Sequence, residues 1–229
     1  MSDNQTSPNS RDWLLLIGGS TYKFTLTGFY LVALVAILKN HGYSLNQLSW
    51  IHLIGSIEAA KVLFAALMER RPAGRFGRFR GWLLAATLGL SAVFGLMACT
   101  DITQNFALLL TCCVLLSAMS AVYGCAMLGL SCIVLPHRER GFGGVIQTMA
   151  ARGGKMIGGA LVLWLYQEYG QTAAAGFMLA FSLLMLLQLL YYREPESPTA
   201  QGSWTALATR LVSFWQQPET GWRWLVLLF

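Results

Sequence analysis

The sequence predicts an all-α protein that crosses a membrane several times, and three observations lead to this prediction. The 229 residues are 55% hydrophobic and only 11% charged, whereas a soluble globular domain carries roughly 25% charged residues. Six segments approach the length of about 20 mostly apolar residues that a helix needs to cross hydrocarbon. The lysines and arginines outside these segments gather in every second loop, as is typical of membrane proteins.

Six membrane helices are therefore expected. The third segment is short unless it extends into its flanks, and the fourth is long enough to be tilted or unwound near Gly124 and Gly129. The predicted spans are residues 13–38, 45–68, 82–98, 106–135, 142–166 and 172–192.

The remaining segments are polar or short. Residues 1–12 are expected to form a disordered cytoplasmic N-terminus. Residues 193–221 are expected to form a cytoplasmic linker, in which apolar residues at helical spacing predict a surface helix over 204–215. Residues 222–229 begin another apolar run that is too short to span, so they are interpreted as the start of a truncated seventh helix.

Loop charges predict the orientation of the six-helix bundle, residues 13–192. With a cytoplasmic N-terminus, Arg11 and the clusters around Arg75, Arg138 and Arg193 all lie inside, and only Lys39 lies outside. Because positive residues accumulate on the cytoplasmic side, the N-terminus is expected there. The expected location is the inner (plasma) membrane, as a multi-pass protein.

Charge also occurs inside the predicted spans, where it is costly. Each central Arg or Lys costs roughly 2.5 to 3.5 kcal/mol on insertion scales, so such residues normally face a bundle interior or a cavity. Four of the five lie within roughly 5 Å of a span midpoint at 1.5 Å per residue, and the exception, Lys61, is about 7 Å to the cytoplasmic side. The excess of positive charge suits an anionic solute. The five residues are Lys23, Glu58, Lys61, Arg152 and Lys155.

Simpler roles compete for some of these residues. Lys61 can pair with Glu58 or reach the cytoplasmic face with its long side chain. Lys23 is too deep to do so easily. Tyr22, Tyr123 and Gln147 could complete the lining of a solute site, since a deep tyrosine usually needs a hydrogen-bond partner.

The fifth span is rich in glycine. Gly154 and Gly158 stand at the GxxxG spacing, which lets two helix backbones approach closely, and this predicts a tightly packed pivot of a moving bundle.

Several other classes of protein are disfavoured. Five cysteines form no CxxC pair and have no histidine at ligand spacing, so no metal or cofactor site is expected. The chain contains no HExxH pair, no GxSxG elbow and no paired carboxylates, so an enzyme is not expected. The net charge of +6 is explained by cytoplasmic loops and does not predict a nucleic-acid partner.

The arrangement of helices and loops resembles the first half of a major facilitator superfamily transporter. That family has a Gly-x-x-x-Asp-Arg loop followed by a Gly-Arg element, and here it corresponds to "AALMER" and then "GR", with Ala65 in place of Gly and Glu69 in place of Asp. The resemblance implies that Glu69, Arg70, Gly74 and Arg75 form a conformational-switch loop. It also implies a second six-helix half as partner and a solute site at the bilayer midplane.

Two longer stretches resemble the branch that holds muropeptide permeases and siderophore permeases of the rhizobactin and pyochelin type. They are "KVLFAALMER" at the end of the second span and "RERGFGGVIQTMAARGGKMIGGALVLWLYQEYG" around the fifth. The branch often carries an acid on the fourth helix, where this chain has none. Lys61 then belongs to a family pattern, and Glu58 becomes the candidate for proton coupling.

The expected function is secondary active transport of an anionic organic solute through the membrane, with a ferric siderophore preferred and a muropeptide as the alternative. Both solutes carry carboxylates, so the basic residues do not separate them. A non-transporting membrane sensor, an assembly subunit or a truncated remnant remains a further alternative. The expected partners are membrane lipid, the small anionic solute and a second six-helix half.

Overall fold

The computed structural model describes residues 9–44, 79–100, 106–136 and 139–192, and the single positions 46, 48, 49, 53, 64, 68, 77 and 194. Within these residues the regular structure is helical, without a strand. Most of the predicted second span, the switch loop and the predicted surface helix 204–215 lie outside the described residues, and so do Glu58 and Lys61.

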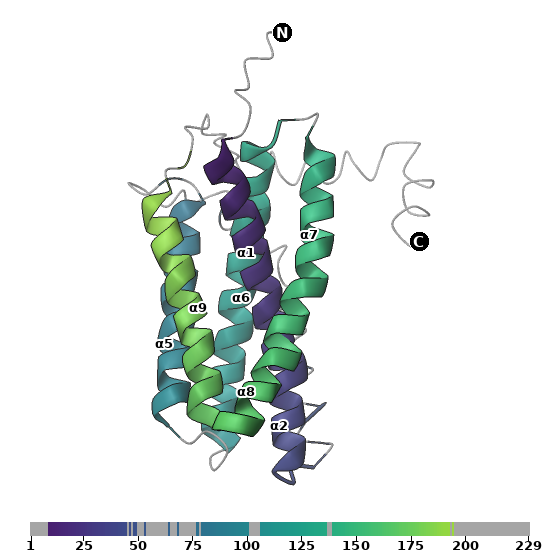
Figure 1. The fold of residues 1–229 in the computed structure, drawn as a ribbon. Coiled ribbons are helices and arrows are strands. Elements are labelled where there is room, and N and C mark those ends of the chain that lie inside the picture. Colours follow the sequence, from purple (N-terminus) through teal and green to yellow (C-terminus); the bar gives the residue numbers. More distant parts are fainter. Residues whose placement is uncertain are drawn as a thin grey trace, which may run out of the picture.

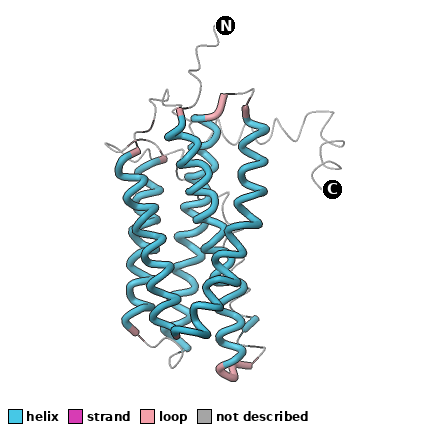
Figure 2. The backbone as a smooth tube through the Cα atoms, in the orientation of Figure 1, coloured by secondary structure: helices cyan, strands magenta, loops and turns pink. Residues whose placement is uncertain are grey.

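Most of the described residues belong to five long helical stretches, which Figures 1 and 2 show side by side in a bundle. Two of them contain a π-helical segment between α-helices. The first stretch consists of α1 (Ser10–Gly28), η1 (Phe29–Ala33) and α2 (Leu34–Asn40). It is followed by α5 (Arg80–Cys99), α6 (Phe106–Val134), the combined stretch of α7 (Arg140–Lys155), η4 (Met156–Leu161) and α8 (Val162–Tyr169), and α9 (Gln171–Tyr191).

These bounds agree closely with five of the predicted spans. Among the described residues, four helices are long and apolar enough to cross a membrane, namely Ser10–Asn40, Arg80–Cys99, Ala107–Val134 and Gln171–Tyr191. The short third span does extend into its flanks, as α5. The division of the chain into bundle, linker and seventh helix stays a prediction.

The unwinding considered near Gly124 and Gly129 is absent, because α6 is α-helical through both positions. The glycines make room for neighbouring side chains instead. A Cβ at Gly124 would lie 3.0 Å from Lys23 Cε, and one at Gly129 would overlap the ring of Phe79.

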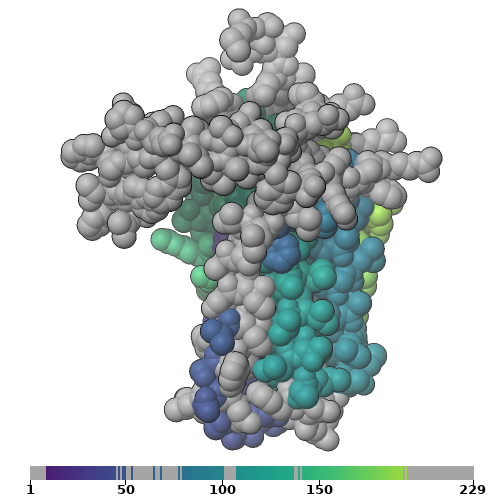
Figure 3. Space-filling model, turned by 180° about the vertical axis from the view of Figure 1, so that it is seen from behind, coloured from purple at the N-terminus to yellow at the C-terminus, as the bar shows by residue number. Residues whose placement is uncertain are grey.

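The helices form a bundle in which α1 has a central place among its neighbours. It contacts α6, α7 and α9, while α5 packs between α6 and α9. Figure 3 shows α5 and α6 together on the opposite side of the bundle. Large apolar side chains fill the contacts, including the fully buried Leu26, Leu83, Phe94 and Leu116.

Helices α1 and α7 approach each other through glycine. A Cβ at Gly154 would lie 2.7 Å from the carbonyl oxygen of Thr21, and a Cβ at Gly158 would overlap that of Thr25. From the other side, a Cβ at Gly28 would lie 2.9 Å from Lys155 Cα. The close packing predicted from the GxxxG spacing is therefore confirmed, and it joins the ends of α1 and α7 next to η1 and η4.

Candidate solute-binding site

Lys23 lies on the side of α1 that faces α6. Its side chain is half-buried and runs along Gly124, so the missing side chain of that glycine gives the lysine its path. The Nζ atom lies 4.5 Å from the centre of the Phe24 ring, in a cation–π contact. Such a contact stabilises a cation in apolar surroundings by about 0.5 to 2 kcal/mol. The chain thus keeps a positive charge inside the bundle.

Tyr22 lies beside Lys23 but is fully buried, with an exposed fraction of 0%. Its hydroxyl donates to Ser182 Oγ at 2.8 Å, and Ser182 Oγ lies 2.7 Å from Ser91 Oγ. This chain of hydroxyls joins α1, α9 and α5. The sequence had predicted that Tyr22 needs a partner, but it had not identified either serine, because single serines in apolar helices give no distinctive pattern.

Tyr123 of α6 is also fully buried, and its ring packs edge-to-face on Tyr22 with the ring centres 5.3 Å apart. Within the described part of the chain its hydroxyl has no hydrogen-bond partner. In the conformation observed, both tyrosine side chains are buried in the core, where Tyr22 contacts Tyr123 of α6 and Ser182 of α9. Their direct contact with solute stays a prediction.

Arg152 and Lys155 are exposed on α7, whereas Gln147 is half-buried. Arg152 borders an open groove of about 460 Å³ along this helix, together with Gly141, Gly144, Val145, Thr148 and Met149. The backbone of Lys155 lies against Gly28 of α1.

The observed helix bounds place the three cations near the middle of their helical stretches. At 1.5 Å per residue, Lys23 lies about 3 Å from the middle of Ser10–Asn40, and Arg152 and Lys155 lie within about 4 Å of the middle of the α7–α8 stretch. Their surroundings differ, because Lys23 is inside the bundle and the other two are on its open face. Whether all three line one cavity with Glu58 stays a prediction.

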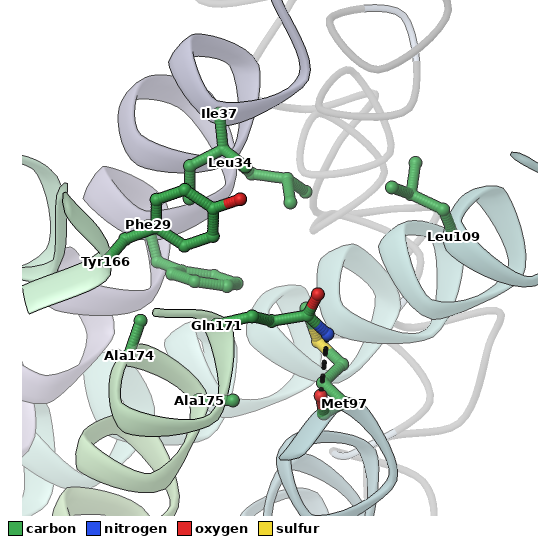
Figure 4. Close-up of a pocket in the computed structure, with 9 residues that line it drawn as sticks. All are labelled: Phe29, Leu34, Ile37, Met97, Leu109, Tyr166, Gln171, Ala174 and Ala175. Carbon is green, nitrogen blue, oxygen red and sulfur yellow. Dashed lines mark hydrogen bonds between the residues drawn. The ribbon is translucent and has the colours of Figure 1, made fainter. Parts of the chain in front are cut away.

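A second cavity lies where α2 and α5 end and α9 begins, and it is too small for an organic solute (Figure 4). Its volume of about 20 Å³ corresponds to a single water molecule. Gln171 lies at its edge and donates through Nε2 to the carbonyl oxygens of Met97 and Thr100, at 3.1 and 2.9 Å. This cavity is therefore a packing feature of the helix ends.

A bundle with several helices of membrane length, one of which holds Lys23 near its middle, belongs to the class of multi-pass helical membrane proteins. The family model of the Major Facilitator Superfamily matches residues 15–229. The chain belongs to this superfamily, whose members are membrane transporters.

Two curated relatives are similar to almost the whole chain. An anhydromuropeptide permease of Escherichia coli (strain K12) is 27% identical over 224 residues, which cover 96% of this chain and 44% of the relative. The anhydromuropeptide permease of Escherichia coli O157:H7 has the same identity and coverage. The chain therefore spans less than half the length of these relatives.

Proposed function

We propose that the protein containing this chain is a secondary active permease for an anionic muropeptide, a cell-wall fragment that carries peptide carboxylates. The observation that carries the proposal is the position of Lys23 near the middle of a membrane-length helix, and of Arg152 and Lys155 near the middle of the α7–α8 stretch. Cations at this depth attract carboxylates strongly, because little water screens the interaction. The relatives support the choice of a muropeptide over the ferric siderophore that the sequence had favoured.

The chain supplies about half of such a permease. In transporters built from two halves, the solute site lies between them at the midplane. The exposed face of α7, with Arg152 and its groove, is suited to line that site together with a second half. Glu58 is the proposed proton-coupling group, with Lys61 as its neighbour, and the N-terminus is proposed to be cytoplasmic.

The test is uptake of a labelled anhydromuropeptide by cells that express the complete protein and lack their own permease. We expect Arg152→Ala and Lys155→Ala each to reduce uptake by about tenfold or more, as for loss of an ion pair worth about 1.4 kcal/mol. Lys155→Arg should be milder than Lys155→Ala, since it keeps the charge.

The matched control is Lys39→Ala, because Lys39 is an exposed cation at the end of α2 and outside the mid-depth group. It should leave uptake unchanged. Normal uptake by a well-inserted Lys23→Ala, Arg152→Ala, Lys155→Ala triple variant would exclude the cationic site. Uptake of a ferric siderophore but not of the muropeptide would restore the first choice of solute.

A further inference from the structure

A large groove lies between the start of α1 and the end of α9. Both helix termini lie at the same end of the bundle (Figure 1). Its volume is about 790 Å³, which makes it larger than the groove along α7. Its wall combines polar and apolar side chains. The lining residues are Asn9, Arg11, Asp12, Leu14, Leu15, Gln188, Tyr191 and Tyr192.

The depth of this groove follows from the helices that form it. Ser10–Asn40 begins at the groove, and Gln171–Tyr191 ends there, and both are long and apolar enough to cross a membrane. Because the ends of such helices lie where hydrocarbon gives way to headgroups, the groove opens at headgroup level. This is so whichever side of the membrane the N-terminus occupies.

The groove contains one acid, Asp12, and one base, Arg11, and the hydrogen bonds recorded for Asp12 come from other residues. Asp12 Oδ2 accepts the backbone N–H of Asn9, and Oδ1 accepts the Tyr192 hydroxyl, both at 2.9 Å. Burial and this hydrogen bond raise the pKa of Tyr192, which therefore stays a neutral donor. Both oxygens of the Asp12 carboxylate thus have donors of their own.

Arg11, unlike Asp12, has a side chain without such partners in the described ranges. Its side chain is exposed, and the structure records no hydrogen bond or ion pair between its guanidinium group and another residue of the described ranges. Glu194, the other nearby acid on the α9 side, accepts backbone N–H groups of Phe79 and Arg80 at the start of α5. The groove therefore presents a free guanidinium group, which is well shaped for a phosphate.

The rest of the wall is amphipathic. Tyr191 has an exposed fraction of 84%, and Leu14 one of 66%. Tyrosine is enriched at headgroup level, where its ring meets hydrocarbon and its hydroxyl meets water. Leu14 lies about one turn deeper than Arg11 along α1, so it borders the hydrocarbon. A polar rim above an apolar floor fits a lipid better than it fits a soluble anion.

We propose that this groove binds an anionic phospholipid, with its phosphate on Arg11 and Tyr191 and an acyl chain over Leu14. The site is separate from the proposed solute site, because it lies at the start of α1, whereas Lys23 lies near the middle of the stretch Ser10–Asn40.

The test measures lipid binding to the purified complete protein, so it does not depend on transport. The protein is delipidated in detergent, titrated with phosphatidylglycerol or with phosphatidylcholine of the same acyl chains, and the bound lipid is counted by native mass spectrometry. We expect the parent to bind phosphatidylglycerol more tightly than phosphatidylcholine. Arg11→Gln should weaken phosphatidylglycerol binding about tenfold or more, because a charge-assisted contact is lost. Arg11→Lys should weaken it less.

The matched control is Lys39→Gln, which removes an exposed cation at the other end of the same helical stretch and should leave binding unchanged. Glycerol phosphate, which has the charge but no acyl chain, should not displace the lipid at equal concentration. Equal binding of the two lipids, an unaltered Arg11→Gln variant, or equal competition by glycerol phosphate would each overturn the proposal.

Discussion

Gly158 lies in η4 where α1 passes closest, and a side chain there would meet the carbonyl oxygen of Thr25. The neighbouring Gly153, on α7, faces open space. Two glycines five positions apart on one helical stretch thus have opposite packing requirements. The difference arises because side chains of a helix point in directions about 100° apart per residue, so only some positions face a given neighbour.

This contrast gives a residue-scale prediction. Gly158→Ala should lower the free energy of unfolding by about 1 to 3 kcal/mol, because the added methyl group forces α1 and α7 apart. Gly153→Ala should be neutral or slightly stabilising, since alanine favours the helix and nothing blocks it. Both are measured by unfolding of the purified protein in detergent micelles. Equal loss of stability in the two variants would contradict the packing argument.

The position of Lys23, Arg152 and Lys155 near the middle of long helical stretches could be predicted from sequence, because charges in apolar runs stand out. The hydroxyl chain of Tyr22, Ser182 and Ser91 could not, since its members are far apart in sequence and pair only after the helices pack. The path of the Lys23 side chain along Gly124 could not be predicted either, because it depends on how α6 is rotated against α1.

At the scale of elements, the helix bounds were predictable because apolar runs end at polar or glycine residues. Gly170, with φ of 84°, separates α8 from α9 near the predicted boundary. The π-helical segments η1 and η4 were not predictable, because a local change of helical period leaves no signature in composition. They contact each other next to the glycine interface of α1 and α7.

The start of α5 and the end of α9 are joined by reciprocal contacts. Arg80 donates through Nε to the carbonyl oxygen of Leu189 at 2.9 Å and through Nη2 to that of Leu190 at 2.8 Å. The carboxylate of Glu194 accepts the backbone N–H groups of Phe79 and Arg80. Each helix thus caps the free backbone groups of the other.

An element-scale prediction follows from this pairing. Arg80→Gln should increase hydrogen exchange in the last turn of α9, because the carbonyl groups of Leu189 and Leu190 lose charged donors and the helix end frays. Glu194→Ala should do the same at the first turn of α5. Peptide-level exchange by mass spectrometry measures both effects. Unchanged exchange at these two turns, with a normal fold elsewhere, would show that the contacts do not stabilise the helix ends.

At the scale of the whole molecule, the described stretches run in both directions, so each end of the bundle carries some helix starts and some helix ends. The end where α1 begins also carries Arg80 and the end of α9, whereas the opposite end carries Lys39 and the start of α9 (Figure 1). The length of each described helix follows from the length of its apolar run in the sequence. Which end faces the cytoplasm depends on charge bias during insertion, which the folded bundle does not record.

The orientation is therefore tested on the membrane itself. In a cysteine-free background, single cysteines are placed near Lys39, Asp101 and Glu168 and, as the matched set, near Arg75 and Arg138. If positive loops remain inside, an impermeant maleimide applied to intact cells should label the first three positions and leave the last two unlabelled. After the membrane is permeabilised, all five should react, which controls for buried cysteines. Strong labelling near Arg75 in intact cells would reverse the orientation and place the free guanidinium group of Arg11 in the outer leaflet.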